Sequence, residues 1–271
     1  MYLNQYGFNV NMMKGVPKPS EFYLHNHNEH EIYVFFEGDV KYVVEEKNYA
    51  LSSEDIIIIR KQEMHRVYHN NPKPYYRIVI MVSPEFFVKN NCPEYESAFL
   101  EDNFSKGNRI SAEVVRESGL RDAIVRLGKY TDNFKNTDTN IANSIMVEIL
   151  HIINAISSFE KPDAVNKTVK KIIEYINENF ASDISLDALC EQFFISKYHL
   201  CRVFKQATGL TVQMYIKQKR LTLVDELVAE GKSLSDASAI AGFNNYSSFY
   251  RTCEKVYKNN PRSAPFNKHK K

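Results

Sequence analysis

A short pattern of a helix-capping residue, an apolar residue and an Arg occurs twice in the last hundred residues. The first copy is SKYHLCRVFK at residues 196–205, and the second, 49 positions later, is NYSSFYRTCE at residues 245–254. In each copy a small polar residue that can cap a helix, Ser196 or Asn245, precedes an apolar residue by four positions and an Arg by six. Arg can donate two hydrogen bonds to guanine, and Tyr and Ser can contact phosphate. The pattern therefore predicts two short helices able to contact DNA.

Another short amphipathic segment precedes each copy, SLDALC at residues 185–190 and SLSDA at residues 233–237. Two helices joined by a tight turn, with Arg on the outer side of the second, form a helix-turn-helix. Residues 211–229 carry apolar side chains at helical spacing and predict one connecting helix of about 28 Å. One turn of B-DNA is about 34 Å, so such a helix could hold the two reading helices over successive major-groove segments.

These residues resemble the AraC/XylS family of transcription regulators. The resemblance covers about residues 166–268, and its matching stretches are 172–180, 184–186, 196–209, 220–221, 241–243, 249–251 and 260–261. Cys190 and Ser238 stand where the family usually has Ala, Cys253 where it has Phe, and Lys258 where it has Gly. Cys253 places a smaller group in the second module's core, and Lys258 removes the residue best suited to a left-handed cap. We therefore expect the second module to be less stable, or to bind more loosely, than the first.

The resemblance implies base and phosphate contacts along the two reading helices, with Arg202 and Arg251 as the strongest candidates for base contacts. The alternative for any one residue is a solvated helix face, but this explains the paired set less well. The implied DNA-binding residues are Lys197, Tyr198, Cys201 and Arg202 in the first helix, and Tyr246, Ser247, Ser248, Tyr250 and Arg251 in the second.

Charge is distributed unevenly along the chain. From Pro162 to Lys271 there are 17 Lys and Arg against 11 Asp and Glu, a net charge of +6, whereas the remaining residues carry −4. The basic part is the part with the repeated pattern, which favours phosphate binding that weakens as salt rises.

Length and composition indicate a soluble protein of two domains, since the chain has 271 residues, 44% of them hydrophobic and 25% charged. No apolar run approaches the roughly 20 residues of a membrane span, and the N-terminus lacks the apolar core of a secretion signal. The four cysteines show no C-x-x-C pair, so reduced thiols and packing roles are expected. We expect a cytoplasmic protein that does not contact membranes.

The N-terminal region has short apolar runs bounded by turns. Strands are predicted within residues 21–82, at 31–36, 41–44, 55–59 and 76–82, with a hairpin turn at 37–39. Several short strands without intervening helices suggest a small barrel or jelly roll. The predicted fold class is α+β in two domains, with a cupin-like β-barrel followed by helices and then an all-α domain carrying two helix-turn-helix motifs.

A cluster of polar residues in this region resembles the first cupin motif, His25-x-His27-x-x-x-Glu31 followed by Gly38, with His65 in place of the second motif's histidine. Arg60 and Gln62 replace the Pro and Gly usual before that histidine. On an extended strand His25, His27 and Glu31 share one face, here the barrel interior. Together with His65 they could hold a divalent first-row metal. The resemblance extends to AraC-type sensor domains, which favours contacts to an organic effector over a metal, and a purely structural role is the third alternative.

The aromatic side chains nearby suit a small polar effector such as a sugar. The predicted effector-binding residues are His25, His27, Glu31, Tyr33, Phe35, Tyr42 and His65. No metal and no cofactor is predicted, the four-residue metal site remaining the weaker alternative.

Residues 111–158 return to helical spacing. An apolar stripe of Ile141, Ile145, Ile149, Ile152 and Ile156 marks one helix of about 20 residues, which either packs on the barrel or builds a dimer interface. Turn-forming and polar residues at 157–163 indicate a linker. The predicted domains are a sensor and dimerisation domain at 1–160, a linker at 161–166 and a DNA-binding domain of seven helices at 167–271.

The sequence thus predicts a homodimeric transcription regulator without enzymatic activity, which binds promoter DNA under the control of a small molecule, with RNA polymerase as a further partner. Effector binding would act by a population shift in how the DNA-binding units are presented. Two alternatives stay open. One is a metal-dependent cupin enzyme with an appended DNA-binding domain, and the other is a scaffold whose helical domain binds protein.

Overall fold

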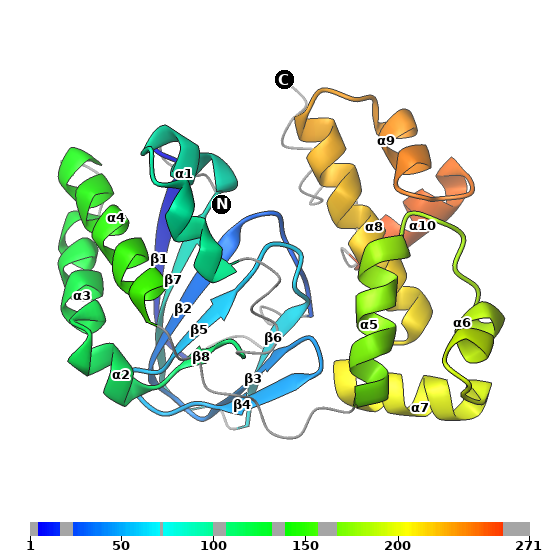
Figure 1. Ribbon diagram of the computed structural model, residues 1–271, viewed down its shortest axis with the longest axis horizontal. Helices are drawn as coiled ribbons and strands as arrows, with labels where there is room; N and C mark the ends of the chain where they lie inside the picture. Colours follow the sequence, from blue (N-terminus) through cyan, green and yellow to red (C-terminus); the bar gives the residue numbers. More distant parts are fainter. Residues whose placement is uncertain are drawn as a thin grey trace. The chain divides into compact units, whose positions relative to one another are not determined.

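The computed structural model describes residues 5–16, 24–70, 73–99, 107–131, 139–156 and 167–256 (Figure 1). Contacts divide the chain into two compact units, the first made of Met1–Tyr23 and Glu29–Asp163 and the second of Leu24–Asn28 and Ala164–Lys271. The linker predicted at residues 161–166, Lys258 and residues 260–261 lie outside the described residues. In the part of the chain that is described, no helix is long and apolar enough to cross a membrane.

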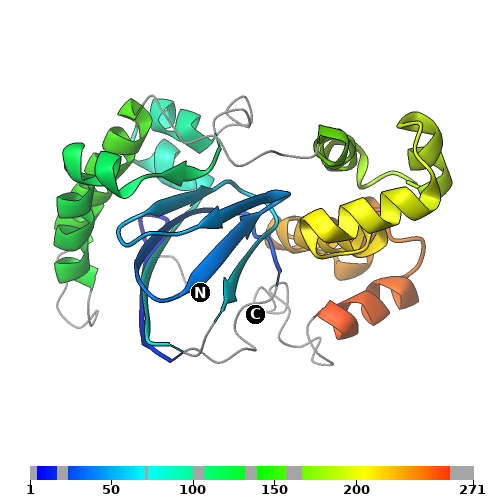
Figure 2. The ribbon, with the colours of Figure 1, turned by 90° about the horizontal axis from the view of Figure 1, so that it is seen from below.

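The first unit contains two sheets whose neighbouring strands are all antiparallel (Figures 1 and 2). The larger sheet has the order β1-β7-β2-β5-β8 and the smaller the order β4-β3-β6. The strands are β1 (Phe8–Gly15), β2 (His30–Glu37), β3 (Val40–Val44), β4 (Lys47–Ala50), β5 (Ile56–Ile59), β6 (His65–His69), β7 (Tyr75–Val82) and β8 (Arg109–Ile110). The predicted fold class, a β-rich N-terminal domain followed by helices and an all-α domain, is confirmed.

The larger sheet is buried on both faces because alternate side chains of its strands enter two different cores. In β2, Ile32 and Val34 belong to one core and Tyr33 and Phe35 to the other. The strands β5 and β7 divide their side chains in the same way. The core that includes Tyr33 also takes residues of the smaller sheet, such as Tyr42, and therefore lies between the sheets.

Helices cover the other face of the larger sheet, where Figure 1 shows α3 and α4 on the side away from β3 and β4. Ile145 and Ile149 of the predicted stripe are buried in the core beneath these helices, whereas Ile141 is 40% exposed. Most of the stripe is therefore core in the single chain. The elements are α1 (Pro84–Lys89), the 3₁₀ helix η2 (Pro93–Phe99), α2 (Ala112–Glu117), α3 (Leu120–Thr131) and α4 (Thr139–Ala155).

The sequence pattern predicted the positions of some of the strands and helices of this unit. Strands β2, β3, β5 and β7 occur at the four predicted places, and the helical region matches α2 to α4. The strands β1, β4, β6 and β8 and the helices α1 and η2 were not predicted. Of these, β1 lies before the region in which strands were expected.

The second unit holds six helices within residues 167–256, of the seven expected for the whole domain. They form two helix-turn-helix pairs, α6 with α7 and α9 with α10, joined by α8. The helices are α5 (Lys167–Asn179), α6 (Leu186–Gln192), α7 (Lys197–Thr208), α8 (Val212–Ala229), α9 (Leu234–Ile240) and α10 (Tyr246–Val256).

Polar side chains cap the start of both reading helices, as the repeated pattern predicts. The Ser196 hydroxyl accepts a hydrogen bond from the His199 backbone N–H at 3.3 Å. The Asn245 side-chain oxygen accepts one from the Ser248 backbone N–H at 2.8 Å. Each bond satisfies an N–H group that would have no partner inside the helix, so the two caps fix where α7 and α10 begin.

The turn that follows α5 is held by a residue of α8 and by a residue that follows α9. Arg220 of α8 donates hydrogen bonds to the carbonyl oxygens of Phe180 at 2.7 Å and Ser182 at 2.8 Å. Gly242, after α9, has a φ of +89°, and a Cβ at this position would lie 2.2 Å from the Ala181 carbonyl oxygen. Only glycine fits there, because any side chain would collide with the backbone of this turn.

The turn between α6 and α7 contains a strained residue. Phe194 has a φ of +51°, which is unfavourable for a residue with a Cβ, and its side chain is 97% exposed. Its ring therefore gains almost nothing from burial to offset the backbone strain.

We expect Phe194→Gly to raise the free energy of unfolding by about 0.5–1 kcal/mol, because glycine adopts this φ without strain and little buried area is lost. Urea unfolding of the full chain measures the change. Phe194→Ala is the matched control, since it removes the ring and keeps the strained φ. A glycine variant no more stable than the alanine variant would show that the strain is not significant.

Candidate DNA interface and effector site

The first reading helix, α7, has one exposed and one buried face. Lys197, Tyr198, Cys201 and Arg202 are all exposed, with Tyr198 79% exposed. They occupy positions i, i+1, i+4 and i+5 and therefore share one side of the helix. The opposite side packs Leu200, Phe204 and Thr208 into the unit. The predicted contact residues thus form a continuous surface.

The second reading helix, α10, repeats this arrangement. Tyr246, Ser247, Tyr250 and Arg251 are exposed. The opposite face buries Phe249, Thr252 and Cys253. Each of these four residues lies 49 positions after an exposed residue of α7. The two helices therefore expose side chains at the same four positions of the repeated pattern.

Ser248, the ninth predicted DNA-binding residue, is placed differently. It is half-buried, and its backbone N–H is used by the Asn245 cap. Its counterpart 49 positions earlier, His199, was not predicted to contact DNA. His199 is exposed, and its Nδ1 lies 3.3 Å from an Arg202 guanidinium nitrogen. His199 is therefore a surface neighbour of Arg202 that sequence reasoning missed.

The charged groups of α7 are held by polar neighbours. Lys197 Nζ donates to Asp187 Oδ1 of α6 at 3.0 Å, and this carboxylate raises the pKa of the lysine. On α10, Arg251 Nε donates to the Ser247 carbonyl oxygen at 3.3 Å. Lys197 would have to exchange its Asp187 bond for one to a phosphate, whereas Arg251 keeps further donors for a base.

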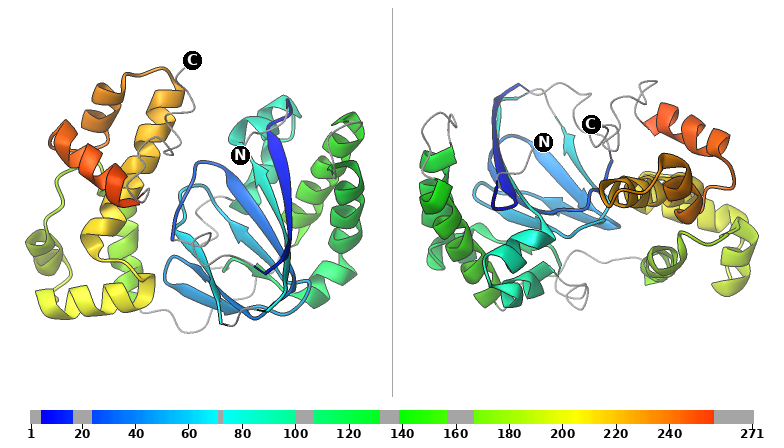
Figure 3. Two further views of the ribbon diagram at one scale, coloured as in Figure 1. Left: turned by 180° about the vertical axis from the view of Figure 1, so that it is seen from behind. Right: turned by 90° about the horizontal axis from the view of Figure 1, so that it is seen from above.

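The helix α8 sets the separation of the two modules. Its 18 residues correspond to about 27 Å. Figures 1 and 3 show α6 and α7 at one end of α8 and α9 and α10 at the other. The length agrees with the connecting helix predicted from residues 211–229.

Five of the seven predicted effector residues meet in the core between the two sheets of the first unit. They are Glu31, Tyr33 and Phe35 from β2, Tyr42 from β3 and His65 from β6, all buried. Tyr42 donates a hydrogen bond to Glu31 Oε1 at 3.3 Å. The Tyr33 hydroxyl lies 2.6 Å from that of Tyr75, a residue the sequence did not single out.

His65 completes this cluster beside Glu31. Its Nδ1 lies 2.8 Å from the Glu63 carbonyl oxygen, and because a carbonyl only accepts, Nδ1 carries the hydrogen. The other nitrogen, Nε2, faces Glu31 Oε2 at 3.5 Å. The Glu63 backbone carbonyl thus holds one ring nitrogen, and the Glu31 carboxylate faces the other.

Burial raises the pKa of both Tyr33 and Tyr42 well above the usual value, and the neighbouring Tyr75 and Glu31 respectively add to the effect. Burial also raises the pKa of Tyr75 to about 12. The three phenols therefore stay neutral at physiological pH. They are hydrogen-bonding groups in an apolar core, which is the chemistry that orients a hydroxylated ligand.

His25 and His27 do not extend β2 as predicted. The strand begins at His30, and residues 28–29 form a bend, so the two histidines do not lie on one continuous strand with Glu31. Both histidines belong to the segment Leu24–Asn28 of the second unit, with ring centroids 5.9 Å apart. Their effector and metal roles stay predictions. His30, which the sequence did not single out, faces the helices and lies 3.1 Å from Glu96.

Two family models match the chain in the order of its two units. An AraC-like ligand binding domain matches residues 19–97, and a helix-turn-helix domain matches residues 189–264. Together they cover more than half of the chain. The chain belongs to the AraC family of transcription regulators. This confirms the resemblance found in the repeated pattern and extends it to the N-terminal unit.

Characterised relatives of this AraC-family protein include the HTH-type transcriptional activator RhaS of Escherichia coli strain SE11, 21% identical over 86% of this chain and 84% of that protein. RhaS of Shigella boydii is 20% identical over 90% and 87%. The solved structure of ToxT from Vibrio cholerae is 14% identical, covers 97% of this chain and 98% of that one, and has a TM-score of 0.43.

The family assignment states the function at a coarse level. This protein is a DNA-binding transcription regulator controlled by an effector, with a ligand-binding domain ahead of its helix-turn-helix domain.

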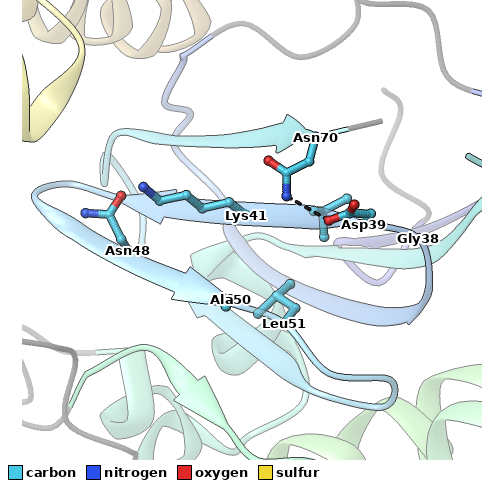
Figure 4. A pocket seen from close by; sticks show the side chains of 8 residues that line it. Gly38, Asp39, Lys41, Asn48, Ala50, Leu51 and Asn70 are labelled. Carbon is cyan, nitrogen blue, oxygen red and sulfur yellow. Dashed lines mark hydrogen bonds between the residues drawn. The ribbon is translucent and has the colours of Figure 1, made fainter. Parts of the chain in front are cut away.

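The regulator also has a groove of about 450 Å³ on the solvent side of β3 and β4 (Figure 4). Lys41 and Asn48 point into it, and Asn70 donates a hydrogen bond to Asp39 Oδ1 at 2.7 Å across one end. Its remaining lining residues are Gly38, Val40, Ala50 and Leu51. None of these residues was predicted to bind a ligand.

A buried polar cluster surrounds the inward-facing side chains of β4. Asn108 accepts hydrogen bonds from Lys47 Nζ at 3.1 Å and the Tyr49 hydroxyl at 3.3 Å, and it donates to Glu63 Oε2 at 3.0 Å. Glu63 also accepts from the Arg60 guanidinium at 3.2 Å. Each charged group in the cluster has a partner of opposite charge or a hydrogen-bond partner. We therefore interpret the cluster as a structural network that holds β8, which follows Asn108, against β5.

Glu46, in the turn between β3 and β4, is buried beside this cluster. Burial raises its pKa to about 7, with a further contribution from Glu45, against a usual value of 4.5. The folded state therefore holds this proton more tightly than the unfolded state. Its contribution to stability is full below pH 4.5 and is lost as pH rises to about 7.

We expect Glu46→Gln to remove this pH dependence. The shift corresponds to roughly 3 kcal/mol, so the variant should be more stable than the wild type at pH 8 by up to that amount and similar to it at pH 5. Urea unfolding at the two pH values measures the difference. Glu37→Gln, at an exposed position of β2, is the control. Equal pH slopes in wild type and Glu46→Gln would contradict the prediction.

Proposed function

We propose that α7 and α10 bind successive major-groove segments of one promoter duplex. The observation that carries this proposal is the pair of capped helices that expose the same four positions at the two ends of α8. If the exposed faces of α7 and α10 were unrelated solvated surfaces, they would not be expected to share the same exposed positions, the same type of N-terminal cap and an Arg at the same place. A single chain then reads two adjacent sites, with their spacing set by α8.

Within this interface each residue type has a separate role. Arg202 and Arg251 are assigned to guanine edges, since a guanidinium can donate two parallel hydrogen bonds. Lys197, Tyr198, Tyr246 and Ser247 lie at the starts of the helices and are assigned to phosphates. Cys201 and Tyr250, one turn into each helix, are assigned to apolar contacts such as a thymine methyl group. Ser248 keeps a weaker role because it is half-buried.

We expect Arg202→Ala and Arg251→Ala each to weaken binding to the preferred duplex by about 1–3 kcal/mol and to relax base preference at one position. The two relaxed positions should lie about one helical turn apart. Selection from random duplexes, followed by titration at two salt concentrations, measures both effects.

Lys171→Ala, on the exposed side of α5, is the matched control for loss of a positive charge. It should lower affinity slightly and equally for all sequences. Unchanged base preference in both Arg variants would refute the assignment. Duplex binding that is absent or insensitive to salt would favour the protein-binding scaffold instead.

The proposed effector site is the core between the sheets, around Glu31, Tyr33, Tyr42 and His65. Support comes from neutral phenols and one carboxylate grouped in an otherwise apolar core within the matched ligand-binding domain. Such a site suits a small hydroxylated molecule such as a sugar. The outer groove at Lys41 and Asn48 is the competing location.

We expect Glu31→Gln to weaken binding of the effector at least tenfold, because a hydrogen bond to a charged group contributes about 1.5–3 kcal/mol. A thermal-shift panel of pentoses, hexoses and deoxyhexoses would identify the sugar, and calorimetry would give its affinity. Glu37→Gln, on the same strand but exposed, is the control. Loss of binding in Asn48→Ala with retention in Glu31→Gln would place the site in the outer groove.

The remaining proposals concern assembly and location. We infer a cytoplasmic homodimer that contacts RNA polymerase and has no enzymatic activity, as is consistent with relatives that are transcriptional activators. Since Ile145 and Ile149 are core, a dimer surface on α3 and α4 would use exposed apolar positions such as Val125 and Ile141. Stoichiometric divalent metal in the purified protein would favour the cupin-enzyme alternative.

A further inference from the structure

The smaller sheet of the first unit has two different faces. Strand β3 places Tyr42 in the core between the sheets, whereas Lys41 beside it is exposed. Strand β4 alternates in the same way, with Tyr49 in the core and Asn48 and Ala50 exposed. The groove of Figure 4 is lined by the exposed set. It is therefore separate from the core to which the effector is assigned.

One end of the groove carries a negative charge that is held in place. In Figure 4, Asp39 and Asn70 lie together at this end. The Asn70 side-chain amide donates to Asp39 Oδ1 at 2.7 Å, and the Asn70 backbone N–H donates to the Asp39 carbonyl oxygen at 3.0 Å. A carboxylate has about four acceptor positions, so it can accept from an amide and from a ligand at once.

Lys41 brings a positive charge to the other end. Its side chain extends along the groove toward Asn48 and away from Asp39 (Figure 4). Among the residues that the structure describes, none makes a hydrogen bond or an ion pair with the Lys41 ammonium group. An ammonium group and a side-chain amide next to each other can both donate to a carboxylate. The groove thus offers donors for a carboxylate at one end and an acceptor for an ammonium group at the other.

The size of the groove narrows the class of ligand. Asp39 and Lys41 are two residues apart, which separates their backbones by about 6–7 Å, and the Lys41 side chain lengthens this separation. A single α-amino acid carries its two charged groups on one carbon and is too short. An extended peptide of two or three residues spans about 7–11 Å. The groove volume of about 450 Å³ can hold such a peptide, and Ala50 and Leu51 add apolar surface for its side chains.

We propose that the outer groove binds a short peptide with free termini, two or three residues long. The peptide carboxylate lies at Lys41 and Asn48, and its ammonium group lies at Asp39. In the order of the smaller sheet, β4 has one neighbour among the described strands, so its other side suits an extended chain. The site goes beyond the proposed function, because neither the DNA interface nor the effector core takes part in it.

The first test measures peptide binding to the full-length protein by calorimetry. The probes are a panel of dipeptides and tripeptides that begins with tri-alanine, each with free termini and again with an acetylated N-terminus and an amidated C-terminus. The best free peptide binds at least tenfold more tightly than its doubly capped form, since each lost ion pair raises the Kd about three- to tenfold. The absence of binding across the panel, or equal Kd values for free and capped peptides, would overturn the proposal.

The second test matches each peptide terminus to one residue. Lys41→Gln and amidation of the peptide remove the two sides of one contact, so each raises the Kd and the combination raises it no further. Asp39→Asn, which keeps an acceptor for Asn70, behaves in the same way with N-acetylation. Lys89→Gln, at an exposed position of α1, is the matched control and leaves the Kd unchanged. Effects that add within either pair would show that the groups do not meet, and the proposal would fail.

The peptide site and the effector core fail in different ways. Glu31→Gln weakens effector binding in the core and leaves the Kd of the peptide unchanged. The peptide measurement needs no duplex, so a wrong assignment of the DNA interface does not affect it. A sugar that binds in place of peptides and is lost in Lys41→Gln would assign the groove to the effector and overturn the peptide proposal.

Discussion

The arrangement of the DNA-binding unit depends on the short turn that follows α5. Arg220 donates two hydrogen bonds to carbonyl oxygens of this turn, and Gly242 packs against the carbonyl between them. The turn thus receives the middle of α8 and the end of α9 at one place. Because the Gly242 backbone meets the Ala181 carbonyl without an intervening side chain, the second module has little freedom to rotate about α8. This constraint, together with the length of α8, keeps the spacing of the two reading helices fixed.

The DNA-binding half could be predicted from sequence because its signals are local. The Ser196 and Asn245 caps, the apolar spacing and the repeated Arg each concern residues a few positions apart. The residues that differ from the usual family pattern were harder to interpret. Cys253 is buried in the second module's core, as its position predicts, but its effect on stability depends on how neighbours such as Phe243 and Phe249 close around it. The left-handed φ of Phe194 could not be predicted from the sequence, because it follows from the geometry of the turn and not from the residue type.

The N-terminal half was predicted less completely because strand ends depend on distant partners. Glu31 pairs with Ile59 and Met81, and Tyr33 with Ile57 and Val79, so β2 begins where those antiparallel neighbours end. His25 and His27 have the right spacing for that face but lie before the first residue of β2, and the alternation of side chains alone cannot locate the start of a strand. The short strand β4 alternates Lys47 and Tyr49 inward, and a buried lysine gives no strand signal without its partner Asn108.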